Sequence, residues 1–225
     1  MKRFLLASAV ALAFSVPAAH AAIGSDFNAG SQGWQVVDFS NPNLSLTPQA
    51  SYTANWHASG GANGGYIDFS DPSSGSFYFS AGSAYLGNLS GYFGGSLSYV
   101  QQVLTSTGEQ WRDDPDLILI GNGQAYVYQQ AANPGSTWQQ FSATLDGAGW
   151  RRGTLAGPAV DSSEFQAALG NVSALYVRGE YINGINETTG LDNVALNPVP
   201  EPETWAMLLA GLGVVAWARR RQQKV

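Results

Sequence analysis

The fold class follows from one segment, Leu117-Ile118-Leu119-Ile120-Gly121-Asn122-Gly123-Gln124-Ala125-Tyr126-Val127-Tyr128. Its two apolar runs read as strands. Asn122-Gly123 between them is the pair that a two-residue hairpin turn prefers, because both central residues of such a turn take positive φ. We therefore predict an antiparallel hairpin with strands over 117–120 and 125–128.

Other parts of the chain repeat the strand pattern. Apolar residues recur with a period near two in six further segments: 66–69, 77–79, 97–100, 141–145, 175–177 and 194–196. One helix is expected over 161–169, because Asp161 and Glu164 form a capping-box pattern and Gly170 follows the apolar face. The sequence thus predicts an all-β fold, a single two-sheet antiparallel β-sandwich with jelly-roll or Greek-key connections and one short helix.

The composition excludes several kinds of chemistry. The 225 residues include no Cys, so the chain has no disulfide framework, no thiolate nucleophile and no Cys-type zinc or iron–sulfur site. Of its two His residues, His20 lies in a leader-like segment. A multi-His metal site is therefore excluded, and we expect His57 to be a surface or half-buried imidazole.

The N-terminus has the layout of a secretory signal peptide. Lys2 and Arg3 precede an apolar run over 4–16, and Ala19-His20-Ala21 supplies the small-residue cleavage pattern. We expect residues 1–21 to be removed on export, with cleavage after Ala21. The alternative is a buried N-terminal helix.

The C-terminus, residues 198–225, has three parts. Pro200-Glu201-Pro202 lies in a rigid, extended stretch, residues 205–218 are apolar, and Arg219-Arg220-Arg221 follow. As a helix the apolar part rises only ~21 Å against a hydrocarbon core of ~30 Å, so snorkelling arginines or a thinned bilayer would have to cover the difference. We expect a tail that anchors the protein in the inner membrane with its basic end cytoplasmic, either permanently or until it is cut and replaced.

This tail resembles the PEP-CTERM sorting signal in all three of its parts. Proteins with that signal come from Gram-negative bacteria that make exopolysaccharide, and an exosortase processes them near the Pro-Glu-Pro motif. The resemblance implies an exosortase-type partner and an exported protein that reaches the cell surface or the extracellular matrix. It implies a destination and no particular activity.

The segment between the two ends is acidic. Fourteen acidic residues stand against four arginines and no lysine in residues 22–198, a net charge of −10. Such a domain repels phosphate backbones, which argues against nucleic acid as a partner. The excess of carboxylates favours a divalent cation instead.

The same segment, taken as a domain over 22–197, resembles the laminin B domain (laminin IV type A). Order and spacing agree over 85–89, 92–99, 114–123, 149–151, 164–181 and 191–194, and the matching motifs include Tyr92-Phe93-Gly94-Gly95-Ser96-Leu97-Ser98-Tyr99. The resemblance implies a β-sandwich akin to carbohydrate-binding and galactose-binding modules, and an extracellular scaffold role without catalysis. This chain lacks the Cys residues and flanking repeats of animal laminins, so no laminin-like polymer partner is implied.

A calcium ion is expected where the two ends of the domain meet. Asp26 and Asn28 open the domain, and Asp192 closes it. Modules that this domain resembles pair their first and last strands and hold Ca²⁺ there with side chains from each end and backbone carbonyls. Hard oxygen ligands without His or Cys suit Ca²⁺. We predict one structural Ca²⁺ with these three residues as ligands; the alternative is that the two acids only cap turns.

Four tryptophans are candidates for a sugar-binding surface, because sugars stack their C–H groups on exposed aromatic faces. They lie in or beside predicted loops: Trp56, Trp111, Trp138 and Trp150. The alternative for each of them is burial in the core of the sandwich.

The acidic loop with Asp113, Asp114 and Asp116 is the one local sign of carboxylate catalysis. Three acids around a proline are expected to point outward and solvate the loop, with a cation contact or catalysis as alternatives. No G-x-S-x-G elbow occurs, and His57 has no evident relay. We therefore do not expect an enzyme.

Two classes of function compete. A non-catalytic surface or matrix module that binds exopolysaccharide or a protein partner predicts exposed aromatic residues on one concave face. An exopolysaccharide hydrolase or lyase predicts two carboxylates ~5–10 Å apart in a cleft. A purely structural matrix protein is a third possibility. The absence of a catalytic pattern favours the first class.

Overall fold

Two antiparallel sheets make up the computed structural model, which describes residues 20–199 except 44, 72, 106–109 and 183–186, together with residue 212. Sheet A has the order β10-β7-β13-β5-β4, and β1 also pairs with β13. Its strands are β1 (Ile23–Ser25), β4 (Asn55–Gly61), β5 (Gly64–Ser70), β7 (Ser96–Val103), β10 (Gln139–Thr144) and β13 (Thr188–Asn197). The described residues thus confirm the predicted all-β sandwich.

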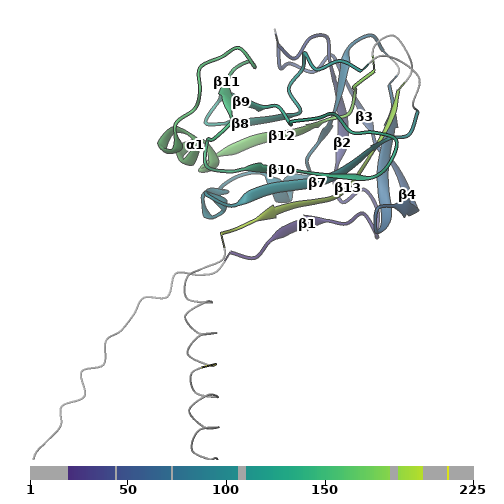
Figure 1. Ribbon diagram of the computed structural model, residues 1–225, viewed down its shortest axis with the longest axis horizontal. Helices are drawn as coiled ribbons and strands as arrows, with labels where there is room; N and C mark the ends of the chain where they lie inside the picture. The colour runs from purple at the N-terminus through teal and green to yellow at the C-terminus, as the bar shows by residue number, and fades with distance from the viewer. Residues whose placement is uncertain are drawn as a thin grey trace, which may run out of the picture.

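Sheet B faces sheet A and has the order β11-β9-β8-β12-β6-β2-β3 (Figure 1). Its strands are β2 (Gln35–Phe39), β3 (Ala50–Thr53), β6 (Ser76–Ser80), β8 (Leu117–Gly121), β9 (Gln124–Tyr128), β11 (Arg151–Arg152) and β12 (Val172–Arg178). The core lies between the sheets, and its largest members include Trp34, Trp150, Tyr85, Tyr99, Phe27, Phe79 and Phe165. Inward side chains alternate with outward ones along the strands, as in Leu97 and Tyr99 of β7.

The predicted hairpin is confirmed as β8 and β9. Asn122 and Gly123 have φ values of 51° and 74°, so both turn residues are left-handed, as the Asn-Gly pair requires. The register follows from this turn, with Gly121 opposite Gln124 and Leu117 opposite Tyr128.

The predicted helix is α1 (Ser162–Leu169), and two short 3₁₀ helices, η1 (Ser83–Tyr85) and η2 (Ser90–Tyr92), join β6 to β7. The Asp161 side chain caps α1 by accepting a hydrogen bond from the Glu164 amide at 2.8 Å. Glu164 also forms two hydrogen bonds with Arg152 at 2.8 and 2.7 Å. The apolar face of α1 closes one end of the core. The bounds of α1 agree with the predicted range of 161–169, so the capping pattern in the sequence located this helix correctly.

Five strands lack a sequence-based prediction: β1, β2, β3, β4 and β11. β3 and β4 are mostly exposed, and each is the last strand on one side of its sheet, so neither carries an apolar alternation. β2 has four consecutive buried residues, Val36 to Phe39, because both of its faces are covered. A pattern of period two cannot identify such strands.

The outer faces of the two sheets differ. On sheet B a second apolar cluster fills the outer face: Val37, Phe39, Tyr78, Ile118, Val127 and Tyr176, with Leu46 and Leu155 packed against it. On sheet A the outward residues of β7 and β10 are partly or fully exposed polar groups such as Ser98, Gln102 and Gln140. The outer face of sheet A is therefore the open sheet face of the described part of the chain.

Candidate functional site

Three aromatic side chains gather on the outer face of sheet A. They are His57, Tyr66 and Trp138, which we call the aromatic platform. The His57 and Tyr66 rings are stacked, with 4.5 Å between centroids and 13° between planes. Trp138 meets Tyr66 edge-on at 5.3 Å and 73°. Both are favourable aromatic geometries, and each ring is only partly buried. The platform is thus a continuous aromatic surface that solvent can reach.

The register of β4 and β5 places the first two rings. His57 lies opposite Tyr66 in this antiparallel pair. Ile67, the next residue, is fully buried in the core, so Tyr66 must point to the outer face. Burial raises the pKa of Tyr66 above 10, and the charge of Asp68 adds to the increase, so the phenol is neutral at pH 7.

Trp138 reaches the platform from the segment that precedes β10. Its Nε1 donates a hydrogen bond to the Gly60 carbonyl at the end of β4, at 3.1 Å. The ring crosses β13 at Gly190, where an added Cβ would lie 2.7 Å from Trp138 Cη2 and 3.3 Å from Tyr66 Cδ2. A side chain at position 190 would therefore displace the Trp138 ring.

Polar groups surround the platform. His57 Nε2 lies 2.9 Å from Asp68 Oδ2, at an angle that does not make a hydrogen bond, and Asp68 Oδ1 accepts one from Asn55 Nδ2 at 3.0 Å. Gln102, opposite Gly190 on β7, donates to the Ser136 carbonyl at 2.7 Å. The face thus combines aromatic rings with a few fixed hydrogen-bonding groups.

The other candidate tryptophans do not join this platform. The expectation for Trp150 as a ligand-binding residue is wrong, because its side chain is in the core at 1% exposure and its Nε1 donates to the Thr144 carbonyl at 2.8 Å. Trp56 is 44% exposed but follows the inward direction of β4, opposite Ile67, at the edge of the sheet. Trp111 is half-buried against the guanidinium of Arg178, with 5.4 Å between the guanidinium carbon and the ring centroid.

The three expected calcium ligands lie near one another, at what we call the terminal-strand site: Asp26, Asn28 and Asp192. Asn28 Oδ1 accepts a hydrogen bond from the Gly65 amide at 3.0 Å, and Asp192 Oδ2 accepts one from the Asn63 amide at 3.3 Å. Both contacts reach the turn of the β4–β5 hairpin. The two ends of the domain and this hairpin therefore meet in one place.

The glycines of the hairpin make room for these oxygen atoms. An added Cβ on Gly61 would lie 2.5 Å from the Gly65 carbonyl oxygen and 2.7 Å from Asp192 Oδ2. An added Cβ on Gly65 would lie 2.3 Å from the Phe27 carbonyl oxygen. Side-chain and backbone oxygens thus converge on the hairpin, which is a donor set of the hard type that Ca²⁺ takes.

The two acids of the terminal-strand site have different environments. Hydrogen bonds from Asn28 and Gln32 lower the pKa of Asp26, which is exposed. Burial raises the pKa of Asp192, and the charge of Asp26 adds to that increase. A cavity of about 400 Å³ adjoins the site and is lined in part by Asp26, Gln32 and Asn193. No group of three or more His, Asp and Glu side chains within the described residues is arranged to hold a metal ion, so carbonyl and amide oxygens would have to complete a calcium site.

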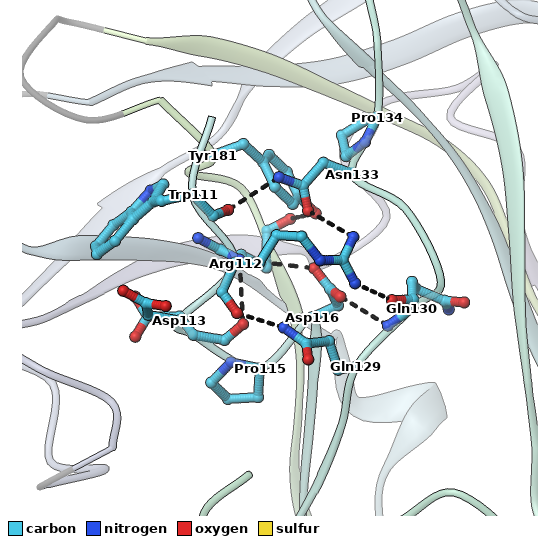
Figure 2. A network of polar contacts seen from close by, with 12 residues as sticks. Trp111, Arg112, Asp113, Pro115, Asp116, Gln129, Gln130, Asn133, Pro134 and Tyr181 are labelled. Atoms are coloured by element: carbon cyan, nitrogen blue, oxygen red, sulfur yellow. Dashed lines mark hydrogen bonds and ion pairs between the residues drawn. The ribbon is translucent and has the colours of Figure 1, made fainter. Parts of the chain in front are cut away.

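The acidic loop before β8 differs from the expectation. Asp113 is exposed, but Asp114 and Asp116 are only 3% and 2% exposed. Asp116 Oδ2 accepts a hydrogen bond from the Gln130 amide at 2.7 Å, within a network in which Arg112 also contacts Gln130 (Figure 2). The prediction of an outward, solvated turn is wrong for these two acids, because partners distant in the sequence hold them inside.

One arginine lies among these buried acids. Arg178 is fully buried, with its guanidinium 4.8 Å from the Tyr181 ring centroid and 3.8 Å from Asp116 Oδ1. Glu187, also fully buried, accepts hydrogen bonds from the amides of Tyr181 and Ile182 at 2.6 Å each. The cluster therefore fixes loop backbone at this end of the sandwich.

Burial strongly raises the pKa values of the acids in this cluster. It raises the pKa of Asp116 to about 6 and that of Glu180 to about 8, and it also raises the pKa of Glu187. Raised pKa values of carboxyl groups also occur in glycosidases. Here, however, the three side chains are at most 5% exposed, so a polysaccharide chain cannot contact them.

Most of the predicted sorting residues lie outside the described residues: Ala19, Pro200, Glu201, Pro202, Arg219, Arg220 and Arg221. Ala21 is described, and its carbonyl accepts a hydrogen bond from the Tyr92 hydroxyl at 2.6 Å. Among the described residues, no helix has the length and apolarity needed to cross a membrane.

Two facing antiparallel sheets with one short helix place the chain among jelly-roll-like β-sandwich modules. The chain belongs to the Laminin B (Domain IV) family, which matches residues 78–203. The PEP-CTERM protein-sorting motif matches residues 198–222, so the chain carries the signal of an exported protein that is anchored at its C-terminus. No curated protein matches the sequence.

Solved structures agree on the fold. The L4b domain of human laminin alpha-2 has a TM-score of 0.60 at 13% identity, over 80% of this chain and 98% of that domain. The family 11 carbohydrate-binding module of the Clostridium thermocellum cellulase Lic26A-Cel5E has a TM-score of 0.52 at 16% identity, over 82% and 98%. A second structure of the family 11 module from that organism holds a β-1,3-1,4-mixed-linked tetrasaccharide; it has a TM-score of 0.52 at 17% identity, over 82% and 99%.

Proposed function

We propose that this protein is a non-catalytic module of the cell surface or exopolysaccharide matrix, which binds glycan through the aromatic platform. The sorting motif supports the location, because it marks proteins that are exported and handled by an exosortase-type enzyme. The aromatic platform carries the proposal for the activity. Its three rings lie on the open face of sheet A with hydrogen-bonding groups beside them.

The chemistry of this face suits a saccharide. Sugar rings present C–H groups that pack on aromatic faces, and their hydroxyls need a few well-placed donors and acceptors. A module with the same kind of fold holds a tetrasaccharide, which supports a glycan as the ligand here. A non-catalytic role is supported by the acids with the largest pKa increases, which are closed to solvent.

A glycan array with the full-length protein and two variants tests the proposal. We expect binding that Trp138→Ala weakens by about tenfold, the loss of one aromatic contact. Trp56→Ala is the matched control, because it removes an exposed tryptophan that lies off the platform. Equal binding by wild type and Trp138→Ala would show that the aromatic platform is not the glycan-binding surface.

Other outcomes separate the alternatives. Release of reducing ends or unsaturated sugars from a bound polysaccharide would identify a hydrolase or a lyase instead. Failure of every glycan to bind, with capture of a surface protein that Trp138→Ala abolishes, would point to a protein ligand. Failure of both would leave a purely structural matrix protein.

We also propose one structural Ca²⁺ at the terminal-strand site. Asp26 and Asp192 would supply carboxylate oxygens, Asn28 an amide oxygen and nearby backbone a carbonyl oxygen, which are ligands that Ca²⁺ prefers. The raised pKa of Asp192 supports the proposal, because a cation would remove the cost of holding that charge in a buried place. Its role would be to fasten the first and last strands.

A further inference from the structure

We infer that the aromatic platform takes an uncharged saccharide chain and discriminates against acidic polysaccharides. This inference rests on the proposed function, because it names the ligand class of the same face. It comes from the distribution of charge over the two sheets, which the aromatic rings alone do not reveal.

Sheet A carries no fixed positive charge. None of its six strands contains Lys or Arg, and neither does the segment 129–138 that delivers Trp138. The domain has four arginines, and all of them lie elsewhere. Arg151 and Arg152 form β11 of sheet B, and Arg178 is fully buried. Arg112 is hydrogen-bonded to Gln130 and Asn133, at the start of the 129–138 segment, and not to any residue of the platform. A uronate, sulfate or phosphate group on the platform would therefore find no arginine or lysine to pair with.

The charge that the platform does present is negative. Asp68 lies beside His57 and neighbours Tyr66 along β5, and Asn55 satisfies only one of its oxygens with a hydrogen bond. Salt screens charges only beyond about 8 Å at physiological ionic strength, so an acidic group bound against these rings would remain exposed to Asp68. Asp68 is only 7% exposed, so it acts through its charge and not by direct contact: it would repel an anion on the rings, whereas a neutral sugar carries no charge for it to repel.

The extent of the platform favours a chain over a single sugar. His57 belongs to β4, Tyr66 to β5, and the Trp138 ring lies over Gly190 of β13, so the rings extend across three neighbouring strands. At about 4.8 Å between strands the platform is roughly 10 Å wide, which exceeds one pyranose ring.

Calorimetric titration of the full-length protein tests this inference with two sets of hexasaccharides. The neutral set holds mixed-linked β-1,3-1,4-glucan, xylan and mannan fragments, and the acidic set holds galacturonate and mannuronate fragments. We expect at least one neutral chain to bind about tenfold more tightly than either acidic chain. This difference in affinity should become smaller as the salt concentration rises. Trp138→Ala and Gly190→Ala should each weaken neutral binding by about tenfold, because the second displaces the ring that the first removes.

A charge insertion provides the converse test. Gln102→Lys places a cation beside Gly190, and we expect it to raise the affinity for acidic chains several-fold. Ser51→Lys adds the same charge to β3 of sheet B and should leave that affinity unchanged. Acidic chains that bind the wild type as tightly as neutral ones, and lose binding in Trp138→Ala, would overturn the inference and leave glycan binding intact. If no chain of either set binds, glycan binding itself fails.

Discussion

A single guanidinium faces a whole group of buried acids at one end of this sandwich. Arg178 is fully buried, and among the described residues its Nε and Nη2 atoms have no hydrogen-bond partner. Four acids near it are each at most 5% exposed: Asp114, Asp116, Glu180 and Glu187. Burial raises the pKa of Asp116 by more than Arg178 and Arg112 lower it, and burial also raises the pKa values of Glu180 and Glu187.

These raised pKa values make the stability of the domain depend on pH. The pKa of Glu180 rises from 4.5 to about 8 on folding and that of Asp116 from 3.8 to about 6, in both cases through burial. The folded state therefore binds more protons than the unfolded chain between these values. The stabilisation is fully present below the unfolded pKa and is lost as pH rises through the folded one. We expect the free energy of unfolding to fall from pH 5 to pH 8, by at most about 1.4 kcal/mol per pH unit for each titrating group.

Urea unfolding at several pH values measures this dependence. Glu180→Gln is the informative variant, because it keeps the size of the side chain and cannot ionise. In this variant the free energy of unfolding should depend less steeply on pH, and at pH 8 it should be larger than that of the wild type. Stability that increases from pH 5 to pH 8 in the wild type would contradict the raised pKa values.

At the scale of elements, the β4–β5 hairpin joins the two candidate sites. Its turn is held from one side by Asn28 and Asp192, through the amides of Gly65 and Asn63. On the other side the Gly60 carbonyl accepts the hydrogen bond from Trp138. Anything that orders the terminal-strand site therefore also orders the strand end that positions Trp138.

Removal of calcium tests the terminal-strand site. If Ca²⁺ binds only the folded state, a hundredfold excess over Kd adds about 2.7 kcal/mol, which corresponds to a shift in Tm on the order of 5–10 °C. We expect EGTA to lower the Tm by that amount and Asp192→Ala to abolish the sensitivity. Asp146→Ala is a matched control, because Asp146 is an acid of the turn after β10 with local hydrogen bonds only. A wild-type melting curve that EGTA does not change would exclude the ion.

Elements with local signals could be predicted from the sequence. The Asn122-Gly123 turn fixes the register of its own hairpin, and Asp161 begins its helix, because both depend on residues close by in the chain. β4 carries no such signal, since it is a mostly exposed edge strand whose partner β5 supplies its register.

The candidate sites depend on contacts between distant residues. The sequence does not distinguish Trp138 from the other three candidate tryptophans, and only its close approach to Gly190 and Tyr66 does so. The burial of Asp116 depends on the Gln130 amide across the β8–β9 pair, which no local pattern reveals. No residue pattern in the sequence predicts the approach of Asp26 to Asp192; it follows from the pairing of the first and last strands, which only the family resemblance implies.

At the scale of the whole molecule, the two ends of the domain leave it together. Ile23 of β1 pairs with Leu196 of β13, and the two strands run side by side (Figure 1). Tyr85 ties them to the core, because its hydroxyl contacts both Ser25 Oγ at 3.0 Å and the Val194 carbonyl at 2.9 Å. The sorting motif begins directly after β13.

This arrangement gives a prediction about processing. We expect mass spectrometry of the protein from its own host to find residues 1–21 missing, and the residues after Pro200-Glu201-Pro202 missing as well. The new N-terminus would be Ala22, one residue before β1. Substitution of Glu201 by Ala should leave the tail in place without changing the loss of residues 1–21. An intact chain in the cytoplasm would contradict the export of this protein.

The position of β13 also determines how the molecule bears mechanical load. A ligand bound as proposed would pull near Gly190, while an attachment through the sorting motif would pull beyond Asn197, about 23 Å further along the same strand. β13 lies inside sheet A, between β7 on one side and β5 and β1 on the other. Force along this strand shears its ladders of hydrogen bonds together instead of opening them one at a time. A polymer bound as proposed and an attachment at the sorting motif would therefore load these ladders in shear.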